Sequence, residues 1–186
     1  MNVIRSAAVF CGASFGDQPI WREAALELGA GLAQRGIRLV YGGGSLGLMG
    51  AVAEGTRAAG GAISGVIPGF LIRREAPHED IAKFEITETM HERKNRMFEL
   101  SDVFISFAGG LGTLDETFEI LTWKQLGLHS KPILICDVEG SAAPLLATIE
   151  ATITMGFARP DIRELYEVVS GVPHLLSRLE EMAKAA

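Results

Sequence analysis

Residues 103–121 read VFISFAGGLGTLDETFEIL, a short apolar run followed by a glycine-rich loop and a helical pattern. The run over residues 103–107 is typical of a strand buried on both faces of a parallel sheet. The residues after the loop place apolar side chains at the spacing of a helix with one core-facing side, at Leu114, Phe118 and Leu121. Strand, loop and helix in this order are the repeating unit of a doubly wound α/β fold.

The same alternation of β-rich runs and helical stretches extends along the rest of the chain. The other runs are Ala7–Cys11, Ile37–Tyr41, Ala62–Ile67, Phe84–Ile86 and Ile133–Cys136. We therefore expect an α/β protein with a mostly parallel sheet and helices on both faces. The segment 72–80 is expected to be a mobile surface loop, and the tail beyond Pro160 a peripheral helix, strand and helix. A length of 186 residues favours a single domain over residues 1–186.

Composition excludes several classes of protein. The apolar fraction of 48% and the charged fraction of 22% are those of an ordinary globular chain. A net charge of −6 argues against a nucleic-acid partner, which requires a basic face. No apolar run approaches the roughly 18 residues of a spanning helix, so we expect no membrane partner and a cytoplasmic location. Cys11 and Cys136 each end an apolar run, which favours buried, reduced thiols.

The first glycine-rich loop, GGGSLG over residues 42–47, fits the G-x-G-x-x-G pattern between a strand and a helix. A dinucleotide site also needs an acidic residue at the end of the next strand, but that strand ends Gly65–Pro68 without one. Two interpretations stay open. The glycines serve only a tight turn and close packing, or they help to bind a mononucleotide or sugar phosphate, with Gly43, Gly44 and Ser14 as binding residues.

The second loop, over residues 109–113, precedes a helix and is a candidate phosphate site. Backbone amides at a helix N-terminus, the helix dipole and a hydroxyl group together attract an anion. No Gly-Lys-Ser/Thr sequence follows, so the loop is not a Walker A loop. Thr113 is the expected N-cap. The candidate binding residues are Gly109, Gly110, Leu111, Gly112 and Thr113.

Glu116 has two interpretations. Thr113 and Glu116 have the spacing of a capping box, which would give the carboxylate a purely structural role. Alternatively, Glu116 points along the ligand toward a sugar carbon, where a carboxylate stabilises a positive centre or activates water.

A second candidate is a cation in an apolar stripe. The helix expected to begin near Thr89 carries Arg93 between Met90, Met97 and Leu100. A guanidinium facing inward keeps its charge, so it must meet a carboxylate, a phosphate or backbone carbonyls. A structural pair with a carboxylate and a local anion site both remain open for Arg93.

Metal and serine chemistry find no support in the sequence. Neither the four histidines nor the two cysteines have a metal-ligand spacing, so we expect no metal and no cofactor. No Gly-x-Ser-x-Gly elbow is present either.

Two segments together closely resemble the paired signature of the LONELY GUY family of cytokinin riboside 5′-monophosphate phosphoribohydrolases. These are MHERKNRM at residues 90–97 and GGLGTLDE at residues 109–116, and the similarity covers nearly the whole chain. The resemblance implies a Rossmann-like nucleotide-binding domain that forms a homodimer or a larger assembly of dimers. It also implies hydrolysis of the N-glycosidic bond of an adenosine 5′-monophosphate, N6-modified or plain, to a free base and ribose 5-phosphate.

The resemblance also assigns roles to residues. It implies that Arg93 and Glu116 are the catalytic pair, that the amides from Gly110 to Thr113 bind phosphate, and that the substrate contacts are Glu75, Lys94 and Thr122. The chain has Ala108 where the family usually has proline, so we expect a less rigid loop.

Two alternatives accompany the resemblance. Relatives have been labelled lysine decarboxylases, but nothing near the lysines suggests a pyridoxal phosphate site. A similar fold serves as a molybdenum-cofactor carrier, which could keep the glycine loops and would not need Glu116. The presence of both Arg93 and Glu116 favours the enzyme.

Overall fold

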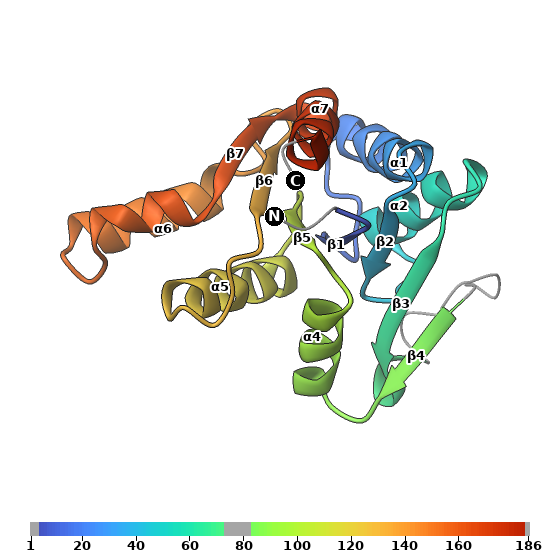
Figure 1. Cartoon of the computed structure of the whole chain (residues 1–186), viewed down its shortest axis with the longest axis horizontal. Coiled ribbons are helices and arrows are strands. Elements are labelled where there is room, and N and C mark those ends of the chain that lie inside the picture. Colours follow the sequence, from blue (N-terminus) through green and yellow to red (C-terminus); the bar gives the residue numbers. More distant parts are fainter. Residues whose placement is uncertain (1–3, 73–82, 185–186) are drawn as a thin grey trace.

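The computed structural model, which describes residues 4–72 and 83–184, contains a seven-stranded sheet in the order β4-β3-β2-β1-β5-β6-β7 (Figure 1). Every neighbouring pair of strands is parallel. The strands are β1 (Ser6–Phe10), β2 (Arg38–Tyr41), β3 (Ile63–Pro68), β4 (Lys83–Thr87), β5 (Val103–Ser106), β6 (Ile133–Asp137) and β7 (Glu167–Ser170). The expected doubly wound α/β class is confirmed.

Helices cover both faces of the sheet (Figure 1). One face carries α1 (Pro19–Gln34), α2 (Gly47–Ala58) and α7 (Gly171–Lys184), and the other carries α4 (Met90–Glu99), α5 (Leu111–Gln125) and α6 (Ala143–Thr154). Two short 3₁₀ helices, η1 (Gly69–Leu71) and η2 (Pro160–Leu165), complete the described part. Helices α1 and α2 approach closely because Gly29 and Gly55 lack side chains, which would collide with the carbonyls of Val52 and Leu26.

The predicted strands are found within one or two residues of their expected ends. The tail differs in one respect, because Pro160–Leu165 is a 3₁₀ helix and the strand after it joins the sheet as its edge. Cys11 and Cys136 are buried and free, as expected. No helix in residues 4–72 or 83–184 has the length and apolar character needed to cross a membrane. Apart from Ile72, the predicted loop lies outside the described residues.

The strand order places a switch point between β1 and β5. From β1 the chain adds β2, β3 and β4 on one side, and then β5, β6 and β7 on the other. The connections that follow β1 and β5 therefore run in opposite directions and leave a crevice at the carboxyl ends of these two strands.

The two capping predictions have different outcomes. Thr89 caps α4 as expected, because its hydroxyl accepts a hydrogen bond from the amide of Glu92 at 3.1 Å. The prediction of a capping box at Thr113 is wrong. Helix α5 begins at Leu111 with Gly110 as its N-cap, which places Thr113 inside the first turn. Glycine is an accepted N-cap, and here the helix begins three residues earlier than expected.

His129 links α5 to β6 in its neutral form. Its Nδ1 accepts a hydrogen bond from the backbone N–H of Lys131 at 3.1 Å, so its Nε2 must carry the proton that is donated to the carbonyl of Ile120 at 2.9 Å. The ring packs edge-on against Phe98 and Phe104. Protonation of Nδ1 would break the first hydrogen bond.

We expect this histidine to make stability depend on pH. Burial, together with the charges of Lys124 and Lys131, lowers the pKa of His129 below its ordinary value of about 6.5. A depressed histidine pKa contributes stability that is fully present above pH 6.5 and lost as the pH falls below it. In urea titrations at pH 7.5 and pH 5, the free energy of unfolding should fall more for the wild type than for His129→Phe. An equal fall in both proteins would contradict the prediction.

Candidate active site

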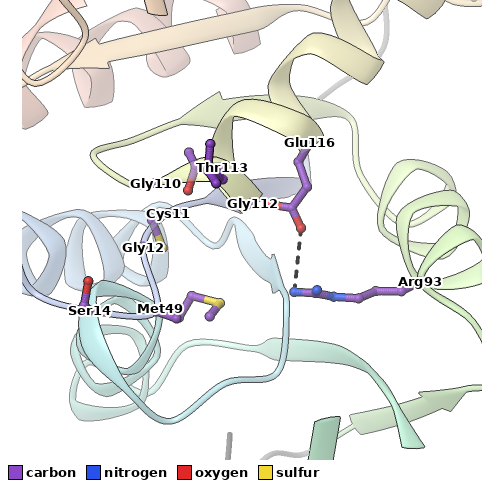
Figure 2. A pocket seen from close by; sticks show the side chains of 11 residues that line it. Cys11, Gly12, Ser14, Met49, Arg93, Gly110, Gly112, Thr113 and Glu116 are labelled. Atoms are coloured by element: carbon purple, nitrogen blue, oxygen red, sulfur yellow. Dashed lines mark ion pairs between the residues drawn. The ribbon is translucent and has the colours of Figure 1, made fainter. Parts of the chain in front are cut away.

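A cavity of about 380 Å³ opens at the carboxyl ends of β1 and β5, at the switch point of the sheet (Figure 2). Its walls come from segments far apart in the chain. The connection after β1 contributes residues 11–14, α2 contributes Met49, and α4 contributes Arg93. The start of α5 contributes residues 110–113 and, one turn later, Glu116.

The start of α5 is the candidate anion-binding end of the cavity. The first helical hydrogen bond runs from the amide of Leu114 to the carbonyl of Gly110, so the amides of residues 111–113 precede it and have no partner within the helix. Space around Gly110 and Gly112 is open. Thr113 is only 5% exposed, and its hydroxyl has no hydrogen-bond partner among the described residues. A buried, unpartnered hydroxyl beside free amides suits a bound phosphate.

Arg93 and Glu116 point toward one another across the cavity (Figure 2). Their side chains are 7% and 11% exposed, and Nη2 lies 3.6 Å from Oε1. That distance is an ion pair but exceeds the range of a good hydrogen bond. The guanidinium instead donates from Nε to the carbonyl of Val66 at 3.2 Å and from Nη2 to the carbonyl of Gly42 at 3.4 Å. Arg93 therefore meets both a carboxylate and backbone carbonyls.

Lys94, the next residue on α4, makes a second set of ion pairs with α5. Its Nζ lies 3.3 Å from Asp115 and 3.0 Å from Glu119. Burial alone would lower the pKa of Lys94, but hydrogen bonds and charges from Glu119 and Asp115 outweigh it and raise the pKa. Lys94 thus offsets two negative charges that would otherwise repel an anion at the start of α5.

Cys11 and Met49 are wall residues that were not predicted from the sequence. Burial and the nearby Glu116 carboxylate raise the pKa of the Cys11 thiol, so Cys11 stays protonated and is a poor nucleophile. The position of Cys11 next to the end of the first strand was an available signal, because ligands bind at that edge of the sheet. Nothing in the local sequence distinguishes Met49 as a wall residue.

Seven of the predicted site residues lie together on the cavity wall: Ser14, Arg93, Gly110, Leu111, Gly112, Thr113 and Glu116. Leu111 is 87% exposed, at the mouth. Glu75 lies outside the described residues.

Five other predicted site residues are not among those that line the cavity, namely Gly43, Gly44, Lys94, Gly109 and Thr122. Gly109 lies against Thr113, and the hydroxyl of Thr122 donates to the carbonyl of Phe118 within α5. Contact of these five residues with a substrate stays a prediction.

Within the described ranges, no group of three or more histidine, cysteine, aspartate or glutamate residues could hold a metal ion. The described residues that line the cavity also include no lysine. Independence from metal ions and from pyridoxal phosphate stays a prediction.

The fold and the cavity define a Rossmann-like α/β protein in which a helix N-terminus suited to an anion adjoins a buried Arg–Glu pair. A family profile described as "possible lysine decarboxylase" matches residues 49–179. The chain is 44% identical to the probable cytokinin riboside 5′-monophosphate phosphoribohydrolase LOGL9 of Oryza sativa subsp. japonica, over 95% of this chain and 78% of that protein. It is 41% identical to LOG3 of Arabidopsis thaliana, a cytokinin riboside 5′-monophosphate phosphoribohydrolase, over 96% and 83%. The chain belongs to this LONELY GUY family, as its resemblance implied.

Solved structures show the same fold at low sequence identity. A molybdenum cofactor carrier protein from Chlamydomonas reinhardtii superposes with a TM-score of 0.72 at 23% identity, over 98% of this chain and 99% of that one. A molybdenum cofactor binding protein from Rippkaea orientalis gives 0.71 at 21% identity, over 98% of both chains. At these identities the likeness concerns the fold alone.

Proposed function

We propose that the protein hydrolyses the N-glycosidic bond of an adenosine 5′-monophosphate, N6-modified or plain, and releases the free base and ribose 5-phosphate. The observation that carries this proposal is the arrangement along α5, where the anion-binding end and Glu116 line one cavity. Gly112 and Glu116 are four residues apart, or about 6 Å along the helix axis. A ribose with its 5′ methylene group spans a distance of this order. The names of the curated relatives support the same reaction.

Different residues bind the phosphate and stabilise the reacting sugar. The amides of residues 111–113 and the Thr113 hydroxyl hold the phosphate, which fixes the sugar beside the Arg93–Glu116 pair. As the bond from C1′ to the base nitrogen breaks, positive charge develops on the sugar, and the Glu116 carboxylate stabilises it. Glu116 then accepts a proton from the water whose oxygen bonds to C1′. The bonding electron pair leaves with the base, which takes up one proton from solvent, and Glu116 returns its own proton to solvent.

Arg93 holds Glu116 in place through an ion pair. The separation of Nη2 and Oε1, 3.6 Å, is longer than that of a good hydrogen bond. The carbonyls of Val66 and Gly42 take the hydrogen bonds of Arg93 instead.

The carrier alternative rests on the fold alone. A carrier needs an anion site but has no use for a carboxylate across from a buried arginine. The Arg93–Glu116 pair therefore favours the hydrolase.

We also propose that residues 1–186 form one nucleotide-binding domain that acts in the cytoplasm as a homodimer or an assembly of dimers. Buried, free Cys11 and Cys136 suit a reducing compartment. Apolar side chains exposed on the α5–β6 and α6–η2 connections, namely Leu126, Leu128, Met155 and Phe157, support assembly. A monomeric mass by light scattering would refute the assembly.

Phosphate dependence is the test of the proposed function. Because the phosphate provides binding energy remote from the reacting bond, kcat/KM for adenosine 5′-monophosphate should exceed that for adenosine by about 100-fold or more, or about 2.7 kcal/mol. Released base is measured for both substrates and for their N6-isopentenyl analogues, with and without a chelator. Equal rates on the nucleoside and its monophosphate would refute the proposal.

A further inference from the structure

The first glycine loop is so far without a role, because neither Gly43 nor Gly44 is among the residues that line the cavity. Its first residue, Gly42, lies directly after β2 and accepts a hydrogen bond from Nη2 of Arg93. We propose that Gly42 is a positioning residue, which holds the guanidinium of Arg93 in the orientation that faces Glu116. This inference rests on the proposed function for its effect on turnover, but not for its effect on structure.

The missing side chain of Gly42 provides the space that the guanidinium occupies. A Cβ atom at Gly42 would lie 1.8 Å from Nη2 and 3.0 Å from Cζ of Arg93, and 3.2 Å from Sδ of Met49. The backbone itself does not require glycine, because Gly42 is not among the residues with positive φ. What forbids a side chain at this position is therefore Arg93, with a smaller contribution from Met49.

Backbone carbonyls at the ends of β2 and β3 determine the orientation of Arg93. Nε is held by Val66 and Nη2 by Gly42, while Nη1 lies 3.8 Å from Sδ of Met90. The planar guanidinium cannot move one nitrogen without moving the others. A methyl group at Gly42 would therefore displace the whole guanidinium of Arg93 relative to Glu116.

The other glycines of the loop have a different purpose. Gly43 has a φ of +76°, and a Cβ there would lie 3.0 Å from Ile67 and 3.1 Å from Phe84. Gly47 has a φ of +60°, and a Cβ there would lie 2.3 Å from the backbone of Ala13 and Ser14. These two positions suit a turn and close packing. In this chain only the first glycine of the G-x-G-x-x-G pattern, Gly42, thus forms a cradle for an arginine.

Gly42→Ala tests the cradle, because its obstacles are the flexible ends of two side chains and the chain should still fold. On adenosine 5′-monophosphate, kcat should fall by about 10-fold or more, since small misplacements in a site are costly. KM should change little, because the phosphate is held by α5. Gly69→Ala is the matched control, since its Cβ would meet nothing closer than 3.7 Å among the described residues. Wild-type kcat in Gly42→Ala would overturn the proposal.

A double-mutant cycle tests the contact between Gly42 and Arg93 through Tm, without any measurement of activity. Gly42→Ala should lower the Tm of the wild type. In the Arg93→Ala background it should leave the Tm unchanged or raise it, because the guanidinium is gone and alanine restricts the unfolded chain more than glycine does. Equal Tm losses in both backgrounds would overturn the proposal. A wild type that cleaves no nucleoside monophosphate would instead refute the proposed function and leave this cycle interpretable.

Discussion

Glu116→Gln should lower turnover of adenosine 5′-monophosphate by about 100-fold or more, a rise of about 2.7 kcal/mol in the barrier, while the protein keeps its fold. Glutamine has the shape of glutamate but no charge to stabilise the developing positive sugar. The structure removes the competing structural explanation, because α5 begins at Leu111 and Glu116 takes no part in a capping box.

The measurement compares kcat and Tm for the wild type, Glu116→Gln and Glu119→Gln. Glu119 is the matched control, since it lies on the same helix and pairs with Lys94 rather than with Arg93. We expect Glu119→Gln to retain most of the activity. Wild-type turnover in Glu116→Gln would show that its charge has no part in the reaction.

Arg93→Ala should also abolish most activity, by about 100-fold or more, because Glu116 then loses the cation that holds it in place. Removing one member of a fully buried pair commonly costs about 3–5 kcal/mol of stability. Here the pair lies on the wall of a cavity, so water can replace the guanidinium at the Val66 and Gly42 carbonyls. We therefore expect the Tm to fall by only a few degrees.

Arg93→Lys separates charge from geometry. Lysine keeps the positive charge but lacks the planar fork that reaches two carbonyls and faces Glu116. Turnover of Arg93→Lys should therefore stay close to that of Arg93→Ala, as measured by released base.

Gross unfolding of Arg93→Ala in a thermal melt would contradict the expected small change in Tm. It would show that the Arg93–Glu116 pair has a structural role.

Most of the sheet was predictable because strands buried on both faces consist of continuous apolar runs, such as residues 133–136. The inward direction of Arg93 was also predictable, since it interrupts an apolar stripe on α4. The alternation of strands with helices likewise predicted a parallel sheet, and in such a sheet the loops that follow the strands lie along the same edges.

Other features depended on contacts that a local pattern does not contain. Thr113 and Glu116 have the spacing of a capping box, yet the preceding glycine starts the helix earlier. Lys94 follows Arg93 directly, but successive helical residues point about 100° apart, so Lys94 faces Asp115 and Glu119 outside the cavity. The role of Gly42 depends on a side chain 51 positions away.

The cavity joins segments separated by about a hundred positions, and these segments come from both halves of the sheet. No single loop or hairpin can form it alone, so only the folded chain binds the ligand. A ligand present at 100 times its Kd then adds about 2.7 kcal/mol to the free energy of unfolding of the entire protein. The nucleotide pool of a cell would accordingly govern how often this chain opens to proteases, and hence its lifetime, as well as how fast it works.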